Sequence, residues 1–72
     1  MSEFIVTFYN VGRDKATFSE SVKEIEHGQL EKAVRKHLAS RYLDFEVDDE
    51  KCTGSVWAGM RKVGDFSFTV KP

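Results

Sequence analysis

The 72-residue sequence has one cysteine, one proline and no apolar stretch long enough to cross a membrane. A single cysteine, Cys52, excludes an internal disulfide, on which small secreted domains usually depend. Ser2 and Glu3 follow Met1, so the sequence shows neither the basic start nor the apolar stretch of a signal peptide. We therefore expect a cytoplasmic protein.

The sequence also lacks a strong excess of charge of either sign. Eleven Lys and Arg residues stand against twelve Asp and Glu residues, which gives a formal net charge of −1. No overall field draws the molecule to nucleic acid or anionic lipid, so electrostatic recognition has to be local. No repeat, low-complexity segment or flexible linker divides the chain. We expect residues 1–72 to form one compact domain.

Alternating apolar and polar residues predict strands at both ends of the chain. Residues 3–11 alternate with period two, and turn residues from Asn10 to Asp14 predict a hairpin whose second strand begins near Lys15. Period two returns at 44–58, where an acidic run breaks or bends the strand and Gly54 suggests a bulge or a close approach. Residues 59–64 are interpreted as a loop, and 65–70 as the last strand.

One amphipathic helix is predicted between these strand segments, from Gly28 to Tyr42. Its apolar stripe consists of Leu30, Ala33, Val34, Leu38 and Tyr42. Its opposite face is basic and consists of Lys32, Arg35, Lys36 and Ala39. Glu31 precedes Arg35 by four residues, a spacing that modestly supports a helix.

The predicted order is strand, strand, helix, strand, strand (ββαββ). It indicates an α+β two-layer sandwich in which one helix covers one face of a four-stranded antiparallel sheet. The sheet side of the core is expected to contain Phe4, Val6, Phe8, Phe18, Val56, Phe66, Phe68 and Val70. The open face is expected to carry Ile5, Tyr9, Val11 and Trp57, which makes it a candidate docking surface.

Residues able to support catalysis or to bind metal ions are few and scattered. His27 and His37 lie ten residues apart, and the acidic run lacks the glycine and closing glutamate of a helix-flanked calcium loop. We expect His37 to be a core-edge histidine bonded to backbone or carboxylate, and Cys52 to be a small apolar filler in a strand. The sequence therefore predicts no metal site, no cofactor and no enzymatic activity.

Charge is sorted along the chain, and this is the best guide to function. Asp44, Glu46, Asp48, Asp49 and Glu50 place five acids in seven residues directly after the basic helix. Such a run is typical of a solvated edge strand that resists aggregation, or of a phosphate-like surface that engages a partner's Lys and Arg. The candidate partner-binding residues are Lys32, Arg35, Lys36, Asp48, Asp49, Glu50 and Trp57.

Two other readings of the same residues remain open. In the first, the basic helix face and Arg61 and Lys62 contact nucleic acid. In the second, exposed strand edges pair two copies into a homodimer.

The chain resembles small phage-encoded inhibitors of the anti-CRISPR type. The resemblance covers nearly the full length, from Phe4-Ile5-Val6-Thr7-Phe8 to Phe66-Ser67-Phe68-Thr69-Val70, and consists of element order, size and charge. It implies a non-catalytic protein that blocks a host nucleoprotein complex by occupying its nucleic-acid-binding or assembly surface. We therefore expect a binding protein whose partner is a protein or a ribonucleoprotein complex.

Overall fold

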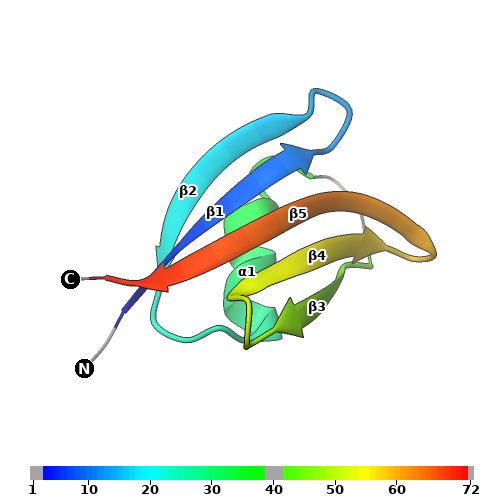
Figure 1. Ribbon diagram of the computed structural model, residues 1–72. Coiled ribbons are helices and arrows are strands. Elements are labelled where there is room, and N and C mark those ends of the chain that lie inside the picture. Colours follow the sequence, from blue (N-terminus) through cyan, green and yellow to red (C-terminus); the bar gives the residue numbers. More distant parts are fainter. Residues whose placement is uncertain (1–2, 39–41, 72) are drawn as a thin grey trace.

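The computed structural model describes residues 3–38 and 42–71, which form a two-layer α+β sandwich (Figure 1). The elements are β1 (Phe4–Val11), β2 (Ala16–Val22), α1 (His27–Val34), β3 (Asp44–Asp48), β4 (Thr53–Ala58) and β5 (Arg61–Val70). All neighbouring strands pair antiparallel in the order β2-β1-β5-β4-β3, and α1 lies across one face of this sheet. The antiparallel sheet with one helix on one face was predicted, whereas the four-stranded ββαββ order was wrong, because the order is ββαβββ.

The additional strand exists because the acidic run is divided between a strand and a turn: Asp44, Glu46 and Asp48 lie in β3, and Asp49 and Glu50 lie in the turn that follows. β3 ends at Asp48 and β4 begins at Thr53, so residues 49–52 close a hairpin. The Asp48 carboxylate accepts hydrogen bonds from the backbone N–H groups of Glu50 and Lys51, at 3.1 and 3.2 Å. An Asp side chain that binds the following backbone stabilises a chain reversal. Cys52 is accordingly exposed in this turn with a φ of +54°, and its predicted place as an apolar filler was wrong.

The last strand is longer than predicted. Only Gly59 and Met60 connect β4 to β5, and most of the predicted loop 59–64 pairs with β4. Val56 pairs with Gly64 but Trp57 pairs with Lys62, so Val63 is an extra residue in β5. This bulge shifts the alternation by one residue, which is why the sequence pattern did not indicate a strand here.

The helix is shorter than predicted. It ends at Val34, and the backbone N–H groups of His37 and Leu38 both bond to the Val34 carbonyl, at 2.8 and 2.9 Å. These bonds close a final tight turn and keep Leu38 on the buried side. Tyr42 is 75% exposed and is not part of the apolar stripe. Ala39 lies outside the described residues.

The core fills the space between α1 and the covered face of the sheet. Its buried residues are Val6, Phe8, Val11, Val22, Leu30, Ala33, Val34, Leu38, Leu43, Val56, Phe66 and Phe68, with Phe4 and Phe18 partly buried against them. Two predictions for this core were wrong. Val70, at the last position of β5, is 59% exposed, and Val11 is buried because the register shifts after Phe8, where Asn10 has a φ of +53°. That irregularity turns Val11 from the open face to the helix side.

Gly54 in β4 allows Phe66 to pack against the neighbouring strand. A Cβ atom on Gly54 would overlap the Phe66 ring and the Glu46 carbonyl oxygen. Phe66 is 1% exposed, and its ring contacts Phe8 and Phe45 at centroid distances of 5.6 and 6.3 Å. The close approach suggested by Gly54 is therefore confirmed, and it fixes β4 between β3 and β5.

Candidate binding surfaces

The open face of the sheet carries two rows of polar side chains that run across the strands. In the first row the pairing register places Tyr9, Asp65, Ser55 and Glu46 side by side, from β1 to β3. In the second row it places Ser19, Thr7, Ser67, Thr53 and Asp48 side by side, from β2 to β3. Neighbouring strands lie about 4.8 Å apart, and alternate residues in a strand about 7 Å apart. The rows therefore place hydroxyl groups and Asp65 at the centre of the face, and the carboxylates of Glu46 and Asp48 at its β3 edge.

A groove lies along the carboxylate side of this face, with a volume of about 470 Å³. We call it the acidic groove, and define it by Tyr9, Glu46, Asp48, Thr53, Ser55, Asp65 and Ser67. Sequence reasoning singled out Asp48 and named Tyr9 as apolar, but it did not predict that Asp65 would join them, because this depends on the register of β5 against β4.

The acids of the groove differ in how far they are neutralised. Asp65 lies 2.7 Å from the ammonium of Lys62 and accepts a hydrogen bond of 3.4 Å from the Ser55 hydroxyl. Asp48 receives two backbone N–H groups, but no cation of the described chain approaches it. Glu46 is exposed, and within residues 3–38 and 42–71 it has neither an ion pair nor a side-chain hydrogen bond. Glu46 and Asp48 therefore bring to the groove two carboxylates whose charge no described cation offsets, and Asp44 adds a third at the start of β3.

The other predicted acidic and aromatic site residues lie beside this groove. Asp49 and Glu50 are exposed in the β3–β4 turn. Trp57 lies on the open face between Asp44 of β3 and Lys62 of β5, and it is half-buried. Its indole N–H is buried without a hydrogen-bond partner in the described part of the chain.

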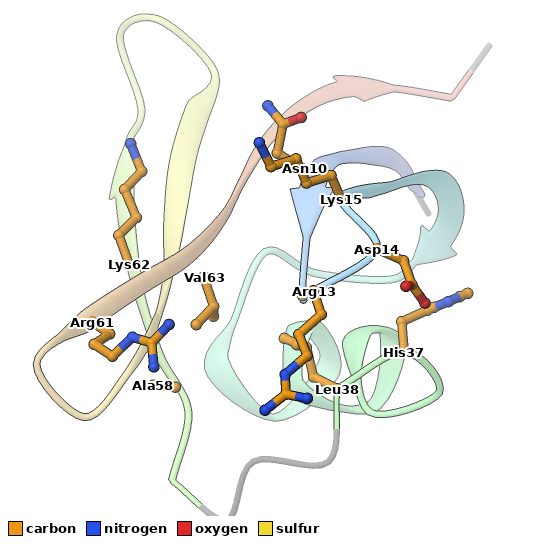
Figure 2. A pocket seen from close by; sticks show the side chains of 11 residues that line it. Asn10, Arg13, Asp14, Lys15, His37, Leu38, Ala58, Arg61, Lys62 and Val63 are labelled. Carbon is orange, nitrogen blue, oxygen red and sulfur yellow. The ribbon is translucent and has the colours of Figure 1, made fainter.

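A second concavity, of about 760 Å³, lies at the end of the sheet where the β1–β2 and β4–β5 turns meet (Figure 2). We call it the basic pocket. Its charged and polar lining consists of Asn10, Arg13, Asp14, Lys15, His37, Arg61 and Lys62. Its apolar lining includes Leu38, Ala58 and Val63. The antiparallel pairing of β1 with β5 brings the two turns together, because the end of β1 lies beside the start of β5.

His37 lies on the wall of this pocket and is exposed, so the prediction of a core-edge histidine bonded to backbone or carboxylate was wrong. Its ring stacks on Phe18 of β2 with 3.8 Å between ring centroids. Among the residues that the structure describes, the imidazole ring of His37 makes no hydrogen bond to a backbone group or a carboxylate.

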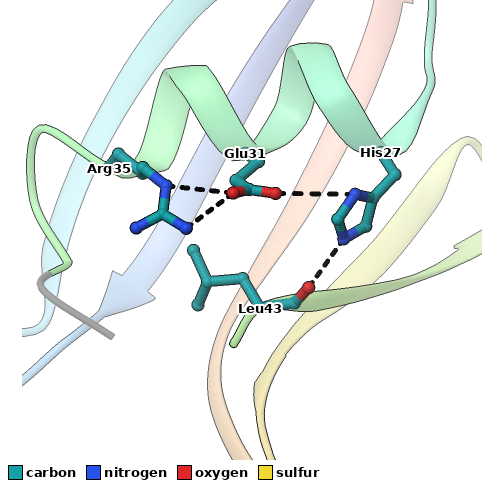
Figure 3. Close-up of polar contacts among 4 residues, drawn as sticks. All are labelled: His27, Glu31, Arg35 and Leu43. Carbon is teal, nitrogen blue, oxygen red and sulfur yellow. Dashed lines mark hydrogen bonds and ion pairs between the residues drawn. The ribbon is translucent and has the colours of Figure 1, made fainter. Parts of the chain in front are cut away.

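The basic helix face lies on the other side of the sheet from the acidic groove. Lys32, Arg35 and Lys36 are exposed as predicted. Arg35 binds Glu31 through Nη2 and Nε at 2.6 and 3.0 Å, which confirms the predicted helical pair (Figure 3). The Lys36 ammonium lies 3.3 Å from the Glu20 carboxylate of β2. Two of the three helix cations are therefore partly neutralised by neighbouring carboxylates.

Glu31 also belongs to the contacts that hold β3 against the helix (Figure 3). The His27 Nε2 atom lies 2.6 Å from the Leu43 carbonyl oxygen, and its Nδ1 atom lies 3.6 Å from Glu31. Leu43 immediately precedes β3, so this contact fixes where the acidic strand begins relative to α1.

Within the described ranges, no group of three or more His, Cys, Asp or Glu side chains is arranged to hold a metal ion. The one described helix is too short to cross a membrane. Comparison with protein-family models, curated proteins and solved structures finds no match to this chain. The two surfaces and their charges are therefore the basis for inferring function.

Proposed function

We propose that this protein is a small non-catalytic binding protein that covers a basic surface of a protein or nucleoprotein partner with its acidic groove. In this role it inhibits the partner by occlusion. The observation that supports the proposal is the β3 edge, where Glu46 and Asp48 project from one strand without a described cation to neutralise them. A partner's Lys or Arg side chains supply the missing countercharge.

The surroundings of these two carboxylates suit protein recognition. Charged side chains at the rim of an interface raise the association rate and select the partner, while aromatic groups near the centre contribute most of the affinity. Tyr9 is 40% exposed in the same groove, and its hydroxyl is held 3.1 Å from that of Ser67. A standard interface buries roughly 800 Å² per partner. The protein has an accessible surface of 5181 Å², so the open face can supply such an area.

The spacing of the carboxylates bears on the kind of partner. Alternate side chains on a strand stand about 7 Å apart, a repeat comparable with that of phosphates along a nucleic-acid strand. We therefore infer that the partner's surface normally binds nucleic acid. The resemblance to phage-encoded inhibitors of the anti-CRISPR type supports the same class of partner in the cytoplasm, although the observed fold has one strand more than the order used for that resemblance.

The test compares two neutralised variants that carry the same change in net charge. E46Q/D48N removes the two groove carboxylates that have no described cation, and it retains an oxygen acceptor at position 48 for the turn. E3Q/E24Q removes two carboxylates elsewhere, of which Glu24 is exposed and Glu3 is paired with Lys71. Partners captured by the wild type from cells of the natural environment are purified and titrated calorimetrically. We expect E46Q/D48N to weaken binding by about tenfold or more, equivalent to ~1.4 kcal/mol, and E3Q/E24Q to change it little.

Competition then distinguishes occlusion from simple attachment. An oligonucleotide that the partner binds should displace the protein, because both need the same cations. Equal loss of binding in E46Q/D48N and E3Q/E24Q would show a general charge effect and contradict the groove. Unchanged binding in both variants would contradict the proposal altogether.

Direct nucleic-acid binding through the helix face has weaker support. Arg35 and Lys36 already have carboxylate partners, which leaves Lys32 as the helix cation with no ion pair in the described structure. The second alternative, pairing of strand edges between copies, is opposed at β3 by the charge of its exposed acids.

A further inference from the structure

We propose that the basic pocket is a second site, distinct from the acidic groove, and that it binds the phosphate groups of a nucleotide. The site lies between the β1–β2 and β4–β5 turns, and Arg13, Lys15 and Arg61 are its phosphate-binding residues. A free nucleotide and a nucleotide within nucleic acid share this chemistry.

The charge of the pocket contrasts with that of the whole protein. Four cations line the pocket against one carboxylate, Asp14, although the net charge of the chain is −1. Lys62 is engaged by Asp65, but Arg13, Lys15 and Arg61 have no ion pair within the described residues. Three cations without a described countercharge thus line one concavity, with the Lys15 ammonium near Asn10 and the two guanidinium groups on the other side of the pocket (Figure 2). A multiply charged anion such as phosphate supplies the missing countercharge.

The two turns that carry these cations are fixed relative to each other. The backbone N–H of Gly12 donates a 3.0 Å hydrogen bond to the Val63 carbonyl and thereby joins the β1–β2 turn to β5. Gly12 has a φ of +73°, which glycine adopts without steric cost. Because the Gly12–Val63 hydrogen bond joins the two segments that carry the cations, binding of a phosphate group requires little rearrangement of the backbone.

One of the cations is held in an unfavourable backbone conformation. Lys15 has a φ of +50°, in the left-handed region that glycine tolerates and a lysine rarely adopts. Strained residues of this kind concentrate at functional sites. A lysine at this position is explained if its ammonium is needed in the pocket.

The rest of the pocket suits the remainder of a nucleotide. Its volume of about 760 Å³ falls within the range of small-molecule sites. Leu38, Ala58 and Val63 offer apolar surface to a sugar or base. In a bound nucleotide, the phosphate groups contact the cations of the pocket, and the sugar or base covers its apolar residues.

The site is tested by NMR titration of the ¹⁵N-labelled protein at low salt with ATP, adenosine and decathymidylate. We expect ATP to shift the amide signals of Gly12, Lys15 and Arg61 and adenosine to leave them unchanged. R13Q/R61Q should weaken ATP binding by about tenfold or more, while the matched variant K23Q/K32Q, which loses the same charge outside the pocket, should retain it.

The outcomes distinguish a free nucleotide from nucleic acid as the source of the phosphate groups. They also test the basic pocket independently of the acidic groove. Tighter binding of ATP than of decathymidylate identifies a free nucleotide as the ligand, and the reverse identifies nucleic acid. E46Q/D48N should bind ATP at least as well as the wild type, so failure of one proposal leaves the other intact. Absence of shifts with both phosphate-bearing probes, or equal weakening in R13Q/R61Q and K23Q/K32Q, would overturn the inference.

Discussion

The acidic groove and the basic pocket are built in different ways. The groove lies on paired strands, where hydrogen-bonded register decides which side chains are neighbours. The pocket lies between two turns. The conformations of Gly12 and Lys15 shape the β1–β2 turn that carries Arg13 and Lys15, while Arg61 and Lys62 stand at the start of β5. A surface carried by strands depends on the core beneath it, whereas a surface carried by turns depends on locally strained backbone. Mutations should therefore affect the stability of the protein in opposite directions at the two surfaces.

The largest effect is expected where the groove meets the core. Gly54→Ala should lower the free energy of unfolding by about 3 kcal/mol, because the new methyl group overlaps the buried Phe66 ring and the Glu46 backbone. Urea unfolding followed by circular dichroism measures this change. Gly28→Ala is the matched control, since nothing lies within 4 Å of its Cβ position. This helical substitution should raise stability by about 0.5–1 kcal/mol, and a loss as large as that of Gly54→Ala would contradict the contact.

A smaller effect of opposite sign is expected at the pocket. Lys15→Gly should raise the free energy of unfolding by about 1 kcal/mol, because it removes the strain of a lysine at positive φ. In thermal unfolding a change of this size corresponds to a rise of about 4–8 °C in Tm. The same variant should bind ATP more weakly. Lys23→Gly, a control in the β2–α1 connection, should bring no gain, and a destabilised Lys15→Gly variant would show that the turn is not strained.

The smallest effect is expected on the helix face, which belongs to neither surface. Lys36→Gln removes the exposed ion pair with Glu20 and should lower stability by at most about 0.5 kcal/mol. The difference should vanish in 1 M salt, because screening weakens exposed ion pairs. Lys32→Gln, without an ion pair in the described structure, serves as the control in the same denaturant titrations. A large, salt-independent loss for Lys36→Gln would assign this lysine a role in packing.

The sequence predicted which segments form most of the strands and the helix, and it predicted which side chains are buried where the periodicity is not interrupted. Alternation predicted the strand at 3–11 and its hairpin partner, and i+4 spacing predicted burial of Leu30, Val34 and Leu38. The prediction of which face a side chain occupies failed where a strand contains one extra residue, near Asn10 in β1 and at Val63 in β5. The extra residue moves the side chains beyond it to the other face of the sheet. Bulges are set by backbone conformation and pairing, so a period-two pattern does not reveal them.

The candidate sites were predicted only in part, because they combine residues from distant segments. Local sequence identified Asp48 and Arg61 as charged surface residues. It did not reveal that Asp65 would stand in the row of Glu46, or that Lys15 and Arg61 would line the same pocket. The first arrangement follows from the register of β5 against β4 and of β4 against β3. The second follows from the pairing of β1 with β5, a contact between distant segments that leaves no local signal in the sequence.

That central pairing also governs how the molecule must assemble. Phe4 pairs with Val70 and Tyr9 with Asp65, and the Lys71 N–H donates a 2.7 Å hydrogen bond to the Glu3 carbonyl. The β1–β2 hairpin and the β3–β4–β5 meander each form from local contacts. They pair with each other only when β5 reaches β1, which requires the chain between these two strands to close into a long loop. Closure of such a loop costs entropy before the central ladder forms, which slows folding. Until it occurs, β1 exposes an unpaired, phenylalanine-rich edge, and aggregation in this interval competes with formation of the native sheet.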